Sequence, residues 1–160
     1  YKGQSKRGRG TRKQPVMALV ERGGSVHTRV IADVTGETLK GAVRALVDRG
    51  ARIITDENSG YIGLDDEFGG GHETTTHSKG EYVKAGTDIH SNTVEGFFAL
   101  LKRGIIGTFH NVSREHLHRY LVEFAFRYNS RLLDDADRVD MLIRRADGKR
   151  LLYRPGTAAA

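Results

Sequence analysis

The sequence has 160 residues, of which 38% are hydrophobic and 29% charged, which is the balance of a globular protein. Its length fits a single domain over residues 1–160, and the lack of cysteine excludes disulfides and thiolate metal sites. Neither a run of about 18 apolar residues nor a secretory signal is present, so we expect a cytoplasmic protein without a membrane part. The remaining metal ligands are carboxylate, imidazole and backbone oxygen, which favour Mg²⁺ or Mn²⁺.

The positive charge is concentrated at the start of the chain. The formal net charge is +6, yet all 20 acidic residues lie beyond residue 13, where they balance the bases. Residues 1–13 form a basic segment spaced by Gly, Ser and Gln, which we predict to be flexible, and its bases are Lys2, Lys6, Arg7, Arg9, Arg12 and Lys13. Such a segment neutralises the phosphates of a nucleic acid without reading bases, and the alternative is a solvated tail. We therefore predict non-specific DNA binding by this segment.

The first half of the chain alternates between strand and helix patterns. Two apolar runs over residues 16–21 and 26–32 flank a turn sequence and predict a β-hairpin. Apolar residues then recur at helical spacing over residues 38–49, which predicts a crossover helix. The buried strand expected over residues 52–55 delivers Asp56 at its C-terminal end, where active sites gather in open α/β sheets.

The second half predicts mainly helix. Residues 57–89 read as loop with some helix, and helices are expected over residues 93–103, 114–128 and 135–145. Strands with an interposed helix, followed by helices, predict an α/β fold in which helices flank a mixed sheet. The helices make up the C-terminal half of this fold.

Two acids and one base are candidates for chemistry. Glu95 and Lys102 are seven residues apart, nearly two turns, so they lie on one side of their helix and could grip a metal and a phosphate. The structural alternatives are a solvated face for this pair, a capping role for Glu95 behind an N-cap at Asn92, and a cap or solvent-exposed turn for Asp56.

Three histidines lie near these residues. His72 and His77 are five residues apart, and His90 precedes the expected helix. A metal cluster is one reading of these histidines. Surface or hydrogen-bonding roles are favoured, because the spacing matches no known zinc-site pattern.

A longer pattern surrounds Glu95. Residues 89–98 read Ile-His-Ser-Asn-Thr-Val-Glu-Gly-Phe-Phe, residues 101–105 read Leu-Lys-Arg-Gly-Ile, and residues 107–113 read Gly-Thr-Phe-His-Asn-Val-Ser. Matches continue with Thr-Asp-Glu at 55–57 and Phe-Arg-Tyr-Asn-Ser-Arg at 126–131. The pattern covers most of the chain and resembles the ISXO-like insertion-sequence transposases, whose catalytic domain is of the DDE type.

The resemblance implies a ribonuclease-H-like fold and a role for each matching residue. Asp56 would be the second catalytic aspartate and Glu95 the terminal acid, so these two would hold Mg²⁺ or Mn²⁺. Lys102 would be the basic residue that follows this acid, and Arg103 beside it would also bind DNA. No residue matches the first aspartate, since Asp33 lies one strand too late, which indicates that the chain is truncated at its N-terminus.

The function expected from this resemblance is cutting and joining of DNA by two-metal phosphodiester chemistry. The partners would be transposon ends and target DNA, with a homo-oligomer assembled on DNA in association with the nucleoid. Because the first aspartate is missing, we expect this chain to be inactive by itself. Two alternatives stay open: a non-catalytic nucleic-acid-binding module, and another ribonuclease-H-like nuclease that cuts without joining.

Overall fold

The computed structural model describes residues 13–75 and 86–149. The hairpin opens the described chain, with β1 (Val16–Val20) and β2 (Val26–Val30) paired antiparallel so that Val16 lies opposite Val30. Gly23 in the connecting turn has φ +75°, a left-handed conformation that glycine adopts without steric cost. The hairpin predicted from the sequence is therefore confirmed.

Helix α1 (Gly36–Leu46) follows and packs its apolar stripe inward. The hydroxyl of Thr35 caps its first turn by accepting a hydrogen bond from the Thr38 N–H. Leu39, Ala42 and Val43 recur at helical spacing and are all buried. Together with core residues of the strands and of the following loop they form a first hydrophobic cluster, whose other buried members are Met17, Ile31, Ile53, Leu64 and Phe68.

Strand β3 (Ile53–Asp56) pairs with β4 (His72–Thr75), and the two run parallel with Asp56 opposite Thr75. The short 3-10 helix η1 (Ser59–Tyr61) lies between them in the sequence. The prediction of loop with some helix is therefore wrong for β4. Its sequence His-Glu-Thr-Thr has only one buried residue, Thr75, so it carries no apolar alternation from which a strand could be predicted.

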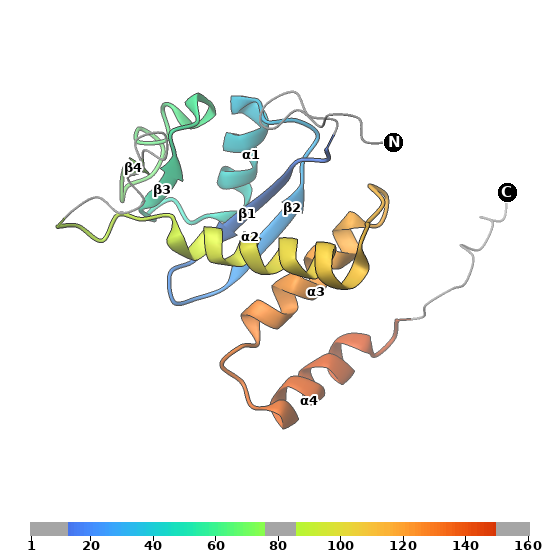
Figure 1. Ribbon diagram of the computed structural model, residues 1–160. Helices are drawn as coiled ribbons and strands as arrows, with labels where there is room; N and C mark the ends of the chain where they lie inside the picture. The colour runs from blue at the N-terminus through green and yellow to red at the C-terminus, as the bar shows by residue number, and fades with distance from the viewer. Residues whose placement is uncertain (1–12, 76–85, 150–160) are drawn as a thin grey trace, which may run out of the picture.

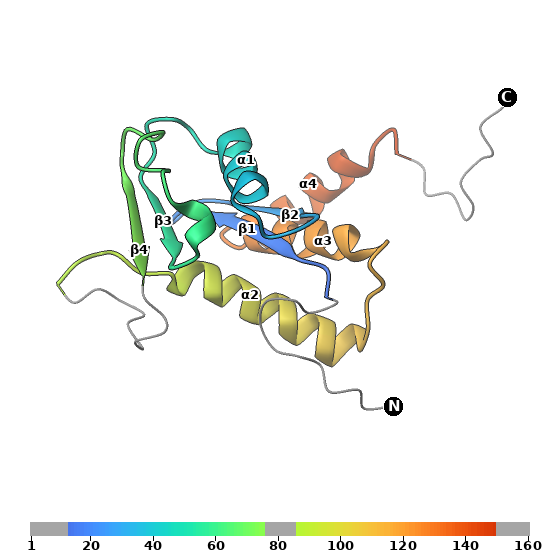
Figure 2. The same ribbon diagram turned by 90° about the horizontal axis from the view of Figure 1, so that it is seen from above.

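The four strands form two pairs instead of the single mixed sheet that we expected. Within the described residues, β1 pairs only with β2 and β3 only with β4. Figures 1 and 2 show the pairs side by side, in the order β4, β3, β1, β2 across the molecule. The α/β class is confirmed, and one pair is antiparallel and the other parallel.

Two further helices cover the face of the hairpin that lies opposite α1. Helix α2 (Asn92–Gly104) packs against β1, continues into the π-helical segment η3 (Ile105–Phe109), and is followed by α3 (Leu117–Asn129), which packs against β2. A second cluster of Val26, Phe97, Leu101 and Leu121 fills this interface. Because side chains alternate along β1, Met17 faces the first cluster, whereas Val16, Ala18 and Val20 face the second.

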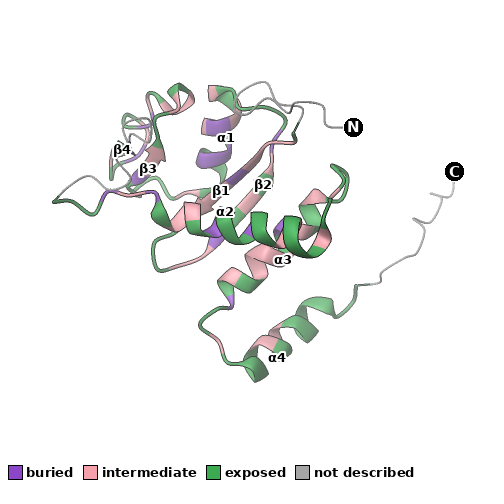
Figure 3. Cartoon of the chain, viewed as in Figure 1, coloured by how far each residue is buried: buried purple, intermediate pink, exposed green. Residues whose placement is uncertain are grey.

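The last helix stands apart from both clusters. Helix α4 (Asp135–Ala146) is capped by the Asp134 carboxylate and has no buried residue. Figure 3 shows it mostly in the colour of exposed residues, outside the body formed by the other elements. Across the described stretches of the chain, no helix is long and apolar enough to span a membrane.

Candidate active site

Asp56 is the last residue of β3, and its side chain is exposed. Its Oδ1 accepts a hydrogen bond from the Asn58 N–H at 3.2 Å, so the carboxylate also organises the turn that follows the strand. Since β3 and β4 are parallel, their C-terminal ends lie at one edge, where α/β proteins hold ligands. The fold thus places Asp56 at a position suited to binding.

Tyr61 lies near this carboxylate. Burial raises the pKa of Tyr61 to about 12, and the negative charge of Asp56 contributes in the same direction. The ring of Tyr61 packs against the first cluster and meets His72 edge to face, with centroids 6.5 Å apart. The ring of Tyr61 is therefore an apolar neighbour of the Asp56 carboxylate, and its hydroxyl remains protonated at neutral pH.

His72 makes a hydrogen bond within the parallel strand pair. Its Nε2 lies 2.9 Å from the Thr55 hydroxyl, and burial lowers its pKa against the opposing effect of Asp65. His77 lies outside the described residues. His90 is half-buried, and its Nδ1 has no hydrogen-bond partner in the described part of the chain. The same part of the chain contains no group of three or more His, Asp or Glu side chains able to hold a metal ion.

Glu95 lies in the first turn of α2 and is half-buried. Its Oε1 accepts a hydrogen bond of 2.8 Å from the hydroxyl of Ser91, a buried residue that immediately precedes the helix. Ser91 is the N-cap residue, so the expectation of an N-cap at Asn92 is wrong by one position. Ser91 thus fixes where the carboxylate of Glu95 can point.

Glu95 and Lys102 share one side of α2, as their spacing predicts. Both line a surface depression together with Phe98 and Ala99. The opposite side of the helix buries Phe97 and Leu101 in the second cluster. Lys102 and Arg103 in the last turn are exposed, which leaves both cations accessible to an anionic ligand.

Two elements from distant parts of the sequence meet near these acids. In both views β3 ends beside the N-terminal turn of α2 (Figures 1 and 2). Asp56 ends the strand, and Glu95 belongs to that turn. Of the predicted DNA-binding bases in residues 1–13, only Lys13 is described, and it is exposed, whereas Lys2, Lys6, Arg7, Arg9 and Arg12 lie outside the described residues.

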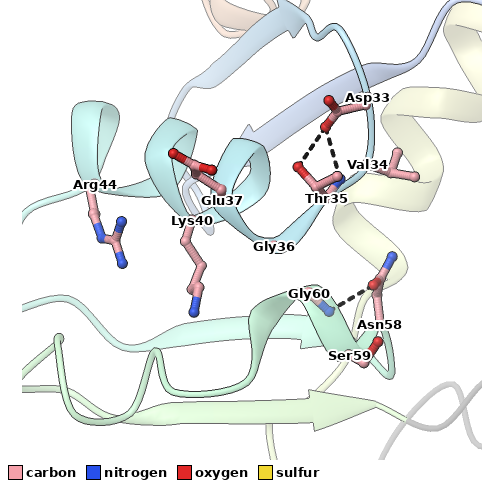
Figure 4. Close-up of a pocket in the computed structure, with 10 residues that line it drawn as sticks. All are labelled: Asp33, Val34, Thr35, Gly36, Glu37, Lys40, Arg44, Asn58, Ser59 and Gly60. Carbon is pink, nitrogen blue, oxygen red and sulfur yellow. Dashed lines mark hydrogen bonds between the residues drawn. The ribbon is translucent and has the colours of Figure 1, made fainter.

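A larger hollow lies between the start of α1 and η1, and sequence reasoning missed it. Its lining includes Gly36, Lys40, Asn58 and Gly60 (Figure 4). Gly36 and Gly60 approach so closely that a Cβ on Gly36 would lie 3.0 Å from the Gly60 carbonyl oxygen. The only hint in the sequence is two small-residue pairs, Thr-Gly at 35–36 and Ser-Gly at 59–60, far apart along the chain.

Asp33 at the rim of this hollow has a structural role. Its Oδ1 accepts hydrogen bonds from the Thr35 hydroxyl at 2.7 Å and the Thr35 N–H at 3.0 Å. These bonds, the side-chain bond first, lower the pKa of Asp33. The carboxylate therefore organises the N-terminus of α1.

These features define an α/β domain with one acid at a strand end, a second acid at a helix start and two cations in the last turn of the same helix. The chain belongs to the family of ISXO2-like transposase domains, whose family model matches residues 1–129. No curated protein and no solved structure matches the chain.

Proposed function

We propose that the chain is the catalytic domain of a transposase that cuts and joins DNA, built on a ribonuclease-H-like fold. The observation that carries the proposal is the meeting of β3 and α2, each of which brings an acid to the same edge of the domain. Membership of the transposase family supports it. The substrate would be the phosphodiester backbone of transposon ends and of target DNA.

The chemistry of the donors fits a divalent metal ion. Asp56 and Glu95 offer hard carboxylate oxygens, which suit Mg²⁺ or Mn²⁺. A bound ion would supply Lewis-acid stabilisation of the negative charge on the phosphate. In this proposal Asp56 and Glu95 hold the ion, Ser91 orients Glu95, and Lys102 holds a DNA phosphate as a point charge.

Two acids are fewer than a two-metal site normally needs. Among the residues that the structure describes, no third Asp, Glu or His joins Asp56 and Glu95 in a group that could hold a metal ion. We therefore propose that these 160 residues alone do not turn over DNA.

Cations would bind DNA independently of the acids. Lys102 and Arg103 extend the candidate site along α2, and the basic segment over residues 1–13 adds further charge. Binding of this kind releases counterions, so its affinity falls steeply as salt rises. The proposal assigns these residues to the DNA backbone and assigns no base reading to them.

Metal binding tests this function. Mn²⁺ affinity of the whole chain should fall at least about tenfold in Asp56→Asn and in Glu95→Gln, since even indirect partners of metal ligands contribute that much. Glu57→Gln removes the neighbouring exposed acid and should leave the affinity unchanged. Equal Mn²⁺ affinity in all four proteins would remove the basis for the catalytic proposal.

A non-catalytic nucleic-acid-binding module is the second candidate, because both acids have structural partners. Asp56 accepts from the Asn58 N–H, and Glu95 accepts from the Ser91 hydroxyl. If this reading is right, Asp56→Asn and Glu95→Gln lower stability and leave Mn²⁺ affinity and DNA binding as they were. The catalytic reading expects the loss of Mn²⁺ affinity with DNA binding retained.

A further inference from the structure

The depression that Glu95 and Lys102 share on α2 also contains an aromatic ring. Phe98 and Ala99 line it together with the acid and the base. The four residues occupy the i, i+3, i+4 and i+7 positions, so they follow one another along a single face of the helix. The depression has a volume of about 430 Å³, which is within the range of pockets that hold small organic ligands.

The ring of Phe98 is held in place before any ligand binds. Phe98 is half-buried and packs against the second cluster. Its ring meets the buried ring of Phe97 edge to face, with centroids 5.9 Å apart and an interplanar angle of 63°. Because these contacts already restrict the side chain, a ligand that stacks on its accessible part costs little further side-chain entropy.

The order of chemical groups along this face matches the order along a DNA strand. A nucleotide in a strand carries its base between two phosphates. Helix α2 carries the Phe98 ring between Glu95, at the candidate metal site, and the exposed ammonium group of Lys102. The acid and the base are separated by about 10.5 Å along the helix axis. Ala99 beside the ring is exposed and small, which leaves room for a flat group to lie against Phe98.

We infer that this face of α2 is a subsite for one unpaired nucleotide, whose base stacks on Phe98 while its flanking phosphates lie at Glu95 and at Lys102. Every base has a π-face, so such stacking needs no particular sequence. A base inside a duplex is stacked between its neighbours, so the subsite selects single-stranded or frayed DNA over an intact duplex. The inference rests on the proposed function, which places a phosphate of the same strand at the candidate metal site.

Binding of single-stranded oligomers with and without bases tests this subsite. The probes are oligothymidylate and an abasic oligomer of equal length, which carry the same phosphates, and fluorescence anisotropy measures their affinity for the whole chain in Mn²⁺. Wild type should prefer oligothymidylate. Phe98→Leu should weaken oligothymidylate binding at least about fivefold and leave binding of the abasic oligomer unchanged. Phe124→Leu, which removes a ring from the same cluster on α3, should keep the wild-type preference.

A substitution outside the core gives a second readout. Ala99 is exposed, and leucine is nearly as good a helix former as alanine, so Ala99→Leu should fold normally while its side chain fills the depression. It should lower the affinity for oligothymidylate alone, whereas Ala136→Leu at an exposed position of α4 should not. Equal wild-type affinity for the two oligomers, or an equal loss for both in Phe98→Leu and Ala99→Leu, would overturn the subsite.

The result is separable from the metal-binding test of the proposed function. Neither Phe98 nor Ala99 can supply a ligand to an ion, so Phe98→Leu and Ala99→Leu should leave the Mn²⁺ affinity at its wild-type value. A wild type without preference for oligothymidylate, whose Mn²⁺ affinity still depends on Asp56 and Glu95, would refute the subsite and leave the proposed function intact.

Discussion

At the scale of single residues, the electrostatic effect of Asp56 on Tyr61 reports on the candidate site. Burial of the phenol and the nearby carboxylate together raise the pKa of Tyr61 to about 12, with burial the larger cause. An added negative charge disfavours the phenolate, so the protonated form is stabilised by both effects. The same negative charge would attract a cation to Asp56. A bound cation would neutralise that charge and so lower the pKa of Tyr61.

Replacing Asp56 by Asn should lower the pKa of Tyr61. The pKa should still lie above the ordinary tyrosine value of 10.0, because the burial of the Tyr61 phenol is unchanged. The measurement is a titration of phenolate absorbance, with Tyr61→Phe used to assign the transition among the six tyrosines. An unchanged Tyr61 transition would show that the carboxylate of Asp56 lies elsewhere in solution.

At the scale of elements, α3 holds the second cluster together through one face only. Leu121 is 2% exposed, while its neighbour Val122 is 65% exposed. The end of the same helix is tied to β2 by Asn129, which accepts from the Val26 N–H at 2.7 Å and donates to its carbonyl oxygen at 3.1 Å. Packing and this double hydrogen bond together fix α3 on the hairpin.

Substitutions of these neighbours should differ sharply in effect. Leu121→Ala should lower the free energy of unfolding by about 2 to 5 kcal/mol, since it removes buried apolar atoms and leaves a cavity. Val122→Ala should change it by no more than about 0.5 kcal/mol, because the side chain is exposed. Urea denaturation measures both, and similar losses for the two variants would show that α3 packs through a different face.

The helices and the hairpin could be predicted because each segment has its own apolar periodicity in the sequence. Residues 38–49 and 93–103 repeat at helical spacing, and the helices α1 and α2 appear within a few residues of those limits. Strand β4 could not be predicted, because hydrogen bonds to β3 stabilise it as a strand and its own sequence has no apolar alternation. The separation of the strands into two pairs is likewise a property of tertiary contacts.

The candidate site was predictable only in part, for a similar reason. Spacing alone places Glu95 and Lys102 on one side of α2, and the depression that they share confirms this. The hydrogen bond from the Ser91 hydroxyl to Glu95 depends on where the helix begins, which the sequence predicts only to within a residue or two. The hollow at Gly36 and Gly60 lies between segments that are far apart in the sequence, so no local sequence pattern predicts it.

At the scale of the whole molecule, the hairpin separates two apolar clusters and so organises the other elements. Helix α1 packs with the first cluster, and α2 and α3 pack with the second. This arrangement leaves the end of β3 beside the start of α2, while α4 lies outside the body (Figure 1). The metal and DNA binding that we propose therefore involves no residue of α4.

The central claim is that Asp56 and Glu95 hold the same divalent ion, and paramagnetic broadening by Mn²⁺ tests it most directly. Backbone amide signals of residues 56 and 95 in the whole chain should broaden together at low Mn²⁺ concentration, ahead of signals from α4. Glu95→Gln should weaken the broadening at both positions. Broadening at only one of the two residues, or at neither, would contradict the shared site.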